Sequence, residues 1–284
     1  MGLIAHTGKI AGSDLLRRAA AIIRTAGRTA FADATTAASA GLKCHVLPDV
    51  RALAAAVDLV LVFGGDGTFL GVAREIAGGQ TPLLGINIGG LGFLTAVSSR
   101  ELTRALKGVW AGEFSFESRD LLEASGRCAG KPVRCLALND IVVGRGNVSR
   151  LIELDVDVNG EPVTRYRCDG LIVSSPTGST AYSLAAGGAL VYPTAEVFAV
   201  TPISPHTLSN RSLILPLTAT LRIRAINPKP ATVLSADGDI VGELDAGETI
   251  TVRRSKHCVR LMHLAGSSFF NALRVKLQWR GANV

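Results

Sequence analysis

The segment Gly64-Gly65-Asp66-Gly67-Thr68 places one carboxylate among glycines, directly after an apolar run that ends at Phe63. Glycines let the backbone turn sharply and approach a ligand closely, and the amides that begin a helix donate to phosphate oxygens. A carboxylate beside phosphates is normally repelled, so Asp66 makes sense there if it accepts a proton from an attacking hydroxyl or helps to hold a metal ion. We interpret Gly64, Gly65, Gly67 and Thr68 as a phosphate loop and Asp66 as its catalytic residue, with a plain tight turn as the alternative.

Several other catalytic motifs do not occur in the sequence. The pattern GxxxxGK[ST] is missing, so the loop is not of the Walker A type. The next glycine after Gly67 is Gly71, which breaks the GxGxxG pattern and weakens the case for a hydride-transferring Rossmann enzyme. Neither GxSxG nor HExxH occurs, so the sequence has no hydrolase nucleophile elbow and no zinc-protease helix.

Two polar segments further along the chain suit a nucleoside. Asn139-Asp140 precedes an apolar run, and an amide beside a carboxylate offers acceptors to both hydroxyls of a ribose, although such pairs also mark turns. Residues 169–183 pass from a strand through small polar residues into a helix, which we expect Ser179 to cap while Tyr182 borders a base; plain capping is the alternative. The glycine-rich stretch 87–94, taken alone, is interpreted as a structural loop.

The hydrophobic pattern changes character along the chain, which predicts two domains. Short apolar runs alternate with helical stretches up to about residue 94, which is typical of a doubly wound parallel sheet, whereas strands dominate after about residue 120. Asn159-Gly160 between alternating segments predicts a hairpin. The predicted strands are 3–6, 57–63, 83–86, 154–158, 163–167, 221–226, 232–235, 250–253 and 259–264, and the predicted helices are one capped by Ser13, one over 68–77, and one that aligns Phe269, Leu273 and Leu277.

Composition limits the class of protein. The 284 residues are 48% hydrophobic and 19% charged, as in a packed globular protein, and no apolar run is long enough to cross a bilayer or resembles a signal peptide. We therefore expect a cytoplasmic protein that does not use a membrane. The net charge of +7 favours anionic partners, but scattered basic residues and 5% aromatics argue against nucleic acid. Five cysteines without a CxxC pair predict buried free thiols.

Taken together and in order, these segments resemble the NAD kinase family. The blocks that carry the resemblance span most of the chain after residue 57: GGDGT at 64–68, GINIGGLGFL at 85–94, Asn139-Asp140, DGLIVSSPTGSTAYSLAAGG at 169–188, PHTLSNR at 205–211 and FFNALRVKLQW at 269–279. The resemblance implies an N-terminal doubly wound α/β domain, 1–96, and a C-terminal β-sandwich domain, 97–265, with the segment 266–284 returning to the first. It also implies ATP and NAD as substrates, a divalent cation, usually Mg²⁺, and a homo-oligomer, a dimer or more commonly a tetramer.

The family's site residues carry over position by position. Asp66 matches the proposed proton acceptor and Gly67 its neighbour at the substrate, while Asp140 stands where the family has Glu, one methylene longer. Asp239 stands where many members carry Gln. The NAD-binding residues that the resemblance implies are Asp66, Gly67, Asn139, Asp140, Arg150, Arg167, Asp169, Thr180, Ala181, Tyr182, Ser183, Ala185 and Asp239.

The expected reaction is transfer of the ATP γ-phosphate to the 2′-hydroxyl of the adenosine ribose of NAD, giving NADP. A lipid or diacylglycerol kinase, which shares GGDGT, and a non-catalytic dinucleotide sensor are the alternatives. In the resembled family a large polar residue two positions before the Asp-Gly pair goes with NAD specificity and glycine with dual use of NADH. Arg167 holds that position, and we expect it to pair with an acid such as Asp169 or to hold a neighbouring loop.

Overall fold

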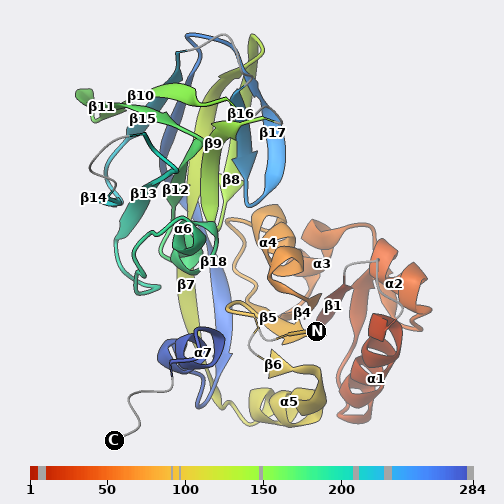
Figure 1. The fold of residues 1–284 in the computed structure, drawn as a ribbon. Helices are drawn as coiled ribbons and strands as arrows, with labels where there is room; N and C mark the ends of the chain where they lie inside the picture. Colours follow the sequence, from red (N-terminus) through yellow and green to blue (C-terminus); the bar gives the residue numbers. More distant parts are fainter. Residues whose placement is uncertain are drawn as a thin grey trace, which may run out of the picture. The chain divides into compact units, whose positions relative to one another are not determined.

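The computed structural model describes residues 1–5, 11–90, 92–95, 97–146, 150–206, 211–226 and 232–279, with only the backbone of residues 11 and 12. The chain divides into two compact units, Met1–Ser118 with Cys258–Val284, and Arg119–His257 (Figure 1). These bounds differ from 1–96 and 97–265 because two long strands, β7 (Phe114–Cys128) and β18 (Thr249–Leu264), each contribute residues to both units. Among the described residues, no helix is both long and apolar enough to span a membrane.

The first unit is built on a parallel sheet. Its strands run in the order β3-β2-β1-β4-β5, with β6 beside β5 and the end of β18 parallel to β5. The order reverses between β1 and β4, and doubly wound sheets bind ligands outside the carboxyl ends of the strands at such a point. The strands are β1 (Gly2–Ala5), β2 (Phe31–Asp33), β3 (His45–Leu47), β4 (Val60–Gly64), β5 (Leu83–Asn87) and β6 (Val97–Ser98).

Helices cover both faces of this sheet (Figure 1). One face packs on α1, α2 and α5 through buried residues such as Leu16, Ala37 and Leu106, while α3 and α4 lie on the opposite face. Both faces are thereby apolar, which agrees with the unbroken burial of β4 from Val60 to Phe63. The helices are α1 (Ala11–Thr25), α2 (Ala34–Ala40), α3 (Val50–Ala56), α4 (Asp66–Glu75), α5 (Leu102–Trp110) after the 3₁₀ turn η1 (Ser99–Glu101), and α7 (Phe269–Lys276).

Several predicted boundaries in this unit are wrong. Ser13 does not cap α1, because the helix already begins at Ala11. The strand predicted over 57–63 begins at Val60, since Val57 is the C-cap of α3. The helix predicted over 68–77 begins at Asp66, because Gly65 is its N-cap. The predicted strand 3–6 corresponds to β1, and its last residue, His6, lies outside the described residues.

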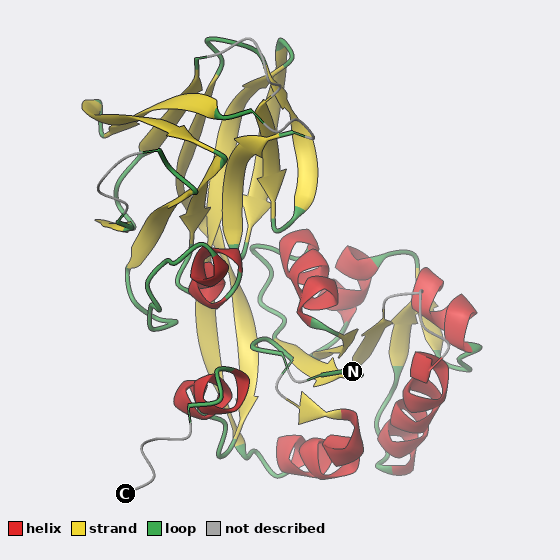
Figure 2. Cartoon of the chain, in the orientation of Figure 1, coloured by secondary structure: helices red, strands yellow, loops and turns green. Residues whose placement is uncertain are grey.

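The second unit is a sandwich of two antiparallel sheets (Figure 2). Side chains from both sheets form one core, with Leu154 and Ile223 from one sheet and Val173 and Phe198 from the other. The strands of the larger sheet in this unit are β7, β8 (Lys131–Ala137), β10 (Ile152–Val158), β11 (Glu161–Cys168), β15 (Leu221–Ala225) and β18; those of the smaller sheet are β9 (Asp140–Arg145), β12 (Gly170–Ser174), β13 (Val197–Ile203), β14 (Leu213–Pro216), β16 (Thr232–Ala236) and β17 (Asp239–Leu244). The 3₁₀ turn η2 (Thr177–Thr180) and the short helix α6 (Tyr182–Ala185) follow β12.

The strand pairing confirms some predictions and corrects one. The hairpin at Asn159-Gly160 is formed by β10 and β11, with φ values of 55° and 86° at the two turn residues, as a primed turn requires. The strands predicted separately at 250–253 and 259–264 are one continuous strand, β18. Cys128 and Cys168 are buried thiols, as predicted, whereas Cys44, Cys135 and Cys258 are half-buried.

Candidate active site

The loop that follows β4 begins at the carboxyl end of that strand, beside the reversal of strand order. A side chain at Gly64 would place its Cβ 2.5 Å from Oγ1 of Thr68, so the tight turn admits only glycine there. A Cβ at Gly65 or Gly67 would meet no atom within 4 Å, which leaves that side of the loop open to a ligand. No side chain caps α4, so the first amides of the helix keep their capacity to donate to phosphate oxygens.

The Asp66 carboxylate is fixed by the glycine-rich loop that follows β5. Oδ1 accepts the N–H groups of Leu94 and Thr95, each at 3.1 Å, and the Thr95 hydroxyl at 3.0 Å. Oδ2 accepts the N–H of Phe93 at 2.8 Å. Among the bonds of the described residues, Oδ2 has only this one donor, so it is the oxygen with capacity to accept a further hydrogen bond.

Two features that sequence reasoning missed hold this arrangement together. A Cβ at Gly92 would lie 2.0 Å from Oδ1 of Asp66, which explains why the loop carries glycine at that position. Thr95 is buried, and its hydroxyl accepts a hydrogen bond from Nδ2 of Asn87 at 2.8 Å. Asn87 ends β5, and its own Oδ1 is buried without a hydrogen-bond partner in the described part of the chain. The 87–94 stretch, interpreted above as structural, is thus the support of Asp66; its Leu91 lies outside the described residues.

The second predicted group of residues lies in the sandwich unit, at the start of β9. Asp140 is buried, with 5% of its surface exposed, and Asn139 before it is half-buried. Burial, together with the negative charge of Asp237, raises the pKa of Asp140 to about 7. Asp237, in the turn between β16 and β17, was not predicted; Asp239, which was, is exposed at the start of β17.

The polar segment after β12 packs directly on Asn139. The Ser175 N–H donates to the Asn139 carbonyl at 2.8 Å, and a Cβ at Gly178 would lie 2.1 Å from the same oxygen. The structure therefore brings Asn139 together with the beginning of the 175–183 segment, although they are far apart in the chain.

Within this segment Ser179 does not cap α6. Its hydroxyl donates to the Pro176 carbonyl at 2.7 Å and accepts the Val191 N–H at 3.0 Å, and α6 begins after Ala181. Ser183 is buried, with its hydroxyl 3.2 Å from that of Thr201. Tyr182 is 48% exposed, so its ring does not fill the core. Thr180 and Ala181 are half-buried and Ala185 is exposed.

The predicted contact between Arg167 and Asp169 is wrong. Oδ1 of Asp169 accepts Nε of Arg145 at 2.7 Å, because β9 and β12 are neighbours and bring these residues to adjacent strand ends. Arg167 is exposed on β11, opposite Glu153 on β10, and Arg150 is exposed as well.

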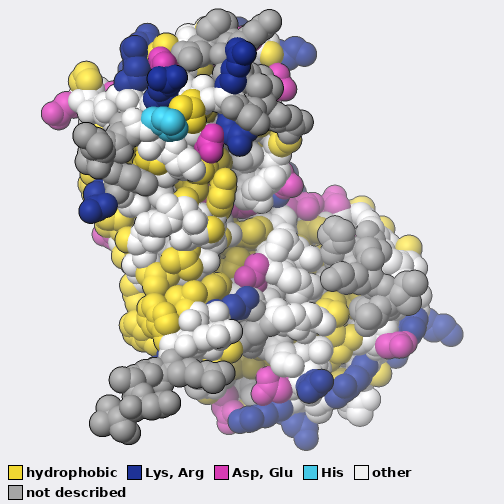
Figure 3. Space-filling view, viewed as in Figure 1, with side chains coloured by type: hydrophobic (Ala, Val, Ile, Leu, Met, Phe, Trp, Pro, Cys, Tyr) yellow, Lys and Arg dark blue, Asp and Glu magenta, His cyan; other side chains and the backbone are white. Residues whose placement is uncertain are grey.

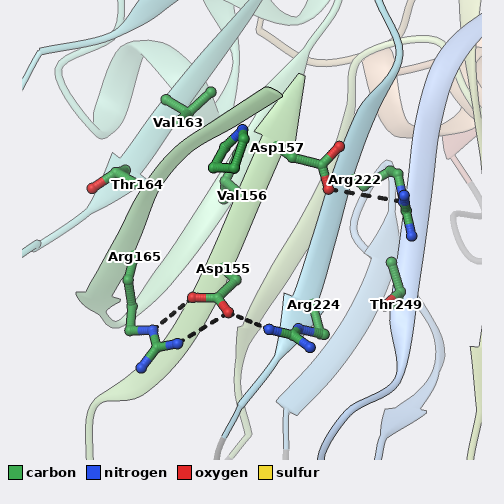
Figure 4. A pocket seen from close by; sticks show the side chains of 10 residues that line it. Asp155, Val156, Asp157, Val163, Thr164, Arg165, Arg222, Arg224 and Thr249 are labelled. Carbon is green, nitrogen blue, oxygen red and sulfur yellow. Dashed lines mark hydrogen bonds and ion pairs between the residues drawn. The ribbon is translucent and has the colours of Figure 1, made fainter. Parts of the chain in front are cut away.

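A hollow of about 470 Å³ lies on the outer face of the larger sheet, and it contains none of the predicted site residues (Figure 4). Asp155 accepts hydrogen bonds from Arg165 at 2.6 and 3.1 Å and from Arg224 at 2.6 Å. These bonds lower the pKa of Asp155 to about 2. Acids of the hollow are thus paired with arginines across neighbouring strands, which accounts for its charges without a ligand. Other basic side chains are spread over the visible surface (Figure 3).

Comparison with known families matches both parts of the chain. Residues 24–114 match the model of the ATP-NAD kinase N-terminal domain, and residues 138–264 match the model of the ATP-NAD kinase C-terminal domain.

Curated relatives agree with these matches. A protein of Acidovorax sp. (strain JS42) named NAD kinase is 44% identical over 250 residues, covering 87% of this chain and 83% of the relative. The NAD kinase of Syntrophotalea carbinolica is 43% identical over 227 residues, covering 78% of this chain and 79% of the relative. The NAD kinase of Methylibium petroleiphilum is 39% identical over 274 residues, covering 94% and 90%.

Solved structures share the fold. Yeast NADH kinase complexed with NADH superposes with a TM-score of 0.89 at 26% identity, covering 100% of this chain and 88% of that one. An NAD kinase from Archaeoglobus fulgidus in complex with ATP superposes with a TM-score of 0.75 at 24% identity, covering 99% of both chains.

Proposed function

This chain belongs to the NAD kinase family, and from that premise we propose that it transfers the γ-phosphate of ATP to the 2′-hydroxyl of the adenosine ribose of NAD, giving NADP. The observation that carries the proposal is the Asp66 carboxylate, which stands at the carboxyl end of β4 in a fixed orientation with Oδ2 able to accept one more hydrogen bond. A carboxylate so placed is suited to orient the attacking hydroxyl and to accept its proton.

The phosphates of ATP are assigned to the loop of Gly64, Gly65, Gly67 and Thr68. The open side of Gly65 and Gly67 leaves room for close approach, and the uncapped start of α4 supplies donors that cost no reorganisation when charge develops on the transferred group. Positioning of this kind supplies most of the rate in phosphoryl transfer, since little covalent chemistry falls to the protein.

NAD is assigned to the residues that the family resemblance implies. Asp140 and Asn139 would bind ribose hydroxyls, and the exposed ring of Tyr182 would border the adenine. The remaining contacts, proposed from the resemblance, are those of Asp66, Gly67, Arg150, Arg167, Asp169, Thr180, Ala181, Ser183, Ala185 and Asp239.

A divalent cation, Mg²⁺ by preference, fits the residues around Asp66. No cluster of three or more acidic, histidine or cysteine side chains in the described part of the chain is arranged to hold a metal by itself. Mg²⁺ in kinase sites is held by one or two carboxylates together with substrate phosphates, and Asp66 is the carboxylate at this loop. When bound, the cation would neutralise charge on the transferred phosphoryl group.

One assay distinguishes the proposed function from the two alternatives, a lipid or diacylglycerol kinase and a dinucleotide sensor. The family models and the named relatives are NAD kinases and give no support to a lipid or diacylglycerol kinase. Purified protein with ATP and Mg²⁺ is offered NAD and a diacylglycerol in parallel, and we expect phosphorylation of NAD only. A dinucleotide sensor would bind NAD without forming NADP.

Two further expectations stay predictions. We expect a homo-oligomer, a dimer or a tetramer, and light scattering of the purified chain measures the molar mass that tests this. A cytoplasmic location is measured by cell fractionation.

A further inference from the structure

Asp237 opens the turn that joins β16 to β17. Its φ is 49° and that of Gly238 is 87°, and Ala236 pairs with Asp239 on either side of them, so the connection is a two-residue primed turn. The turn alone explains an Asp-Gly sequence, because short polar residues tolerate the left-handed region. Asn or Gly at position 237 would satisfy the backbone equally well.

The carboxylate of Asp237 accepts backbone hydrogen bonds that the turn does not require. Oδ1 accepts the N–H groups of Asn139 at 2.7 Å and Asp140 at 3.2 Å, and Oδ2 accepts the N–H of Leu138 at 3.0 Å. The N–H of Asp237 in turn donates to the Asp140 carbonyl at 3.0 Å. An Asn side chain has one acceptor oxygen and would point its NH₂ at one of these donors, so the set requires a carboxylate. Hydrogen bonds to an ionised acceptor are the stronger class.

These bonds fix Asn139 from the side opposite to the 175–178 segment. Its N–H is held by Asp237, and its carbonyl is held by Ser175 and covered by Gly178. The peptide planes on both sides of Asn139 are therefore set by residues distant in the sequence, and they determine where the Asn139 and Asp140 side chains begin.

We infer that Asp237 is a positioning residue for the dinucleotide, acting through the backbone of Leu138 to Asp140 on the side chains of Asn139 and Asp140. This inference rests on the proposed function, in which those two side chains bind NAD. Asp237 need not touch the substrate.

The negative charge of Asp237 gives its positioning role a second measurable effect, on the pH dependence of the reaction. It faces Asp140 from the β16–β17 turn, whereas β12 presents the uncharged Ser174 opposite Asp140. If the ionised Asp140 accepts the ribose hydroxyls, removal of the Asp237 charge moves the acid limb of the pH profile of kcat/KM for NAD to lower pH. The reason is that the ionised form of Asp140 is then less disfavoured.

The clean variant is Asp237→Gly, which keeps the turn and removes the carboxylate. Its matched control is Asn159→Gly, at the first position of another primed turn of this unit, where Oδ1 of Asn159 accepts the Thr220 N–H at 2.9 Å. Both variants lose a turn side chain that binds backbone, but only the first touches 138–140. KM for NAD, KM for ATP, the melting temperature and the pH profile of kcat/KM for NAD are measured for each.

We expect Asp237→Gly to stay folded and to raise KM for NAD by about tenfold or more, with KM for ATP little changed and the acid limb moved to lower pH. Amide hydrogen exchange at 138–140 should quicken. Asn159→Gly should leave both KM values as in the wild type. An unchanged KM for NAD in folded Asp237→Gly, or an equal change in both variants, overturns the inference. Failure of the proposed function would be recognised separately, because the wild type would then form no NADP. The amide exchange rates at 138–140 would still show whether Asp237 holds that segment.

Discussion

The Thr95 hydroxyl donates to Oδ1 of Asp66 at 3.0 Å while it accepts Nδ2 of Asn87 at 2.8 Å. The three side chains thus form a chain of hydrogen bonds from the end of β5 to the start of α4. Since Thr95 is buried, it holds the carboxylate in a single orientation and keeps water from competing for Oδ1. The carboxylate that we propose to be catalytic is oriented by residues whose own types suggest no chemistry.

Thr95→Val should lower kcat without changing KM for NAD or ATP. Valine keeps the volume but removes the donor to Oδ1, and a hydrogen bond to a charged group contributes about 1.5–3 kcal/mol, so kcat should fall roughly tenfold or more. Thr95→Ser keeps the hydroxyl and should restore most of the rate. Steady-state kinetics of the two variants check this, and equal losses in both would show that packing of the methyl group matters instead.

Asp140 should make the protein less stable as pH rises. Its pKa is raised to about 7 in the folded protein, above the value of about 3.9 in an unfolded chain. The folded state therefore binds more protons between these values, so the stability contribution is full below about pH 3.9 and is lost as pH rises through about 7. Asp140→Asn should gain roughly 2–3 kcal/mol relative to the wild type between about pH 5 and about pH 8. Denaturant unfolding at both pH values measures this difference, and a pH-independent difference would contradict the raised pKa.

Tyr182→Ala should weaken NAD binding more than it lowers stability. The ring is 48% exposed, so its removal forfeits little core packing, whereas a stacked base would lose about 1–3 kcal/mol. Tyr192→Ala is the matched control, since Tyr192 is 53% exposed in the same unit. Calorimetric NAD titrations and melting curves separate the effects. A large drop in melting temperature with unchanged NAD affinity would refute the binding role.

Arg167→Gly should raise relative activity with NADH. The side chain is exposed and does not pair with Asp169, which binds Arg145. The role that stays a prediction is that Arg167 holds a neighbouring loop and thereby fixes the shape of the pocket around the planar oxidised ring, while the reduced ring is bulkier at C4. We expect the wild type to prefer NAD strongly. The ratio of kcat/KM for NAD and NADH is compared in the two proteins, and an identical ratio removes Arg167 from substrate selection.

Local sequence features predicted one part of this molecule well. The glycine-rich turn after a buried strand and the Asn159-Gly160 hairpin are each encoded within a few neighbouring residues, so pattern and turn chemistry suffice. The support of Asp66 comes from Phe93, Leu94 and Thr95, which are 27 to 29 residues away, and such non-local bonds leave no periodic signal.

The support of Asn139 by Asp237 could not be predicted for the same reason, because this contact is also non-local. In the sequence Asp237 has the pattern of an ordinary turn residue. No local pattern predicts its contact with Asn139, which is 98 residues earlier. For Ser179 the prediction was wrong: a serine before a helix is typical of a cap, but its hydroxyl donates to the carbonyl of Pro176, three residues back, and accepts the N–H of Val191.

The central claim, that Asp66 is the acid–base residue of an NAD kinase, is tested most directly by coupled detection of NADP from purified protein, NAD, ATP and Mg²⁺. Asp66→Asn is compared with Thr95→Val, which loses a bond to the same carboxylate but keeps the base. We expect the wild type to form NADP and Asp66→Asn to lose about 10²–10⁴-fold in kcat, well beyond the loss in Thr95→Val, while both variants remain folded. Near-normal turnover by Asp66→Asn would contradict the claim.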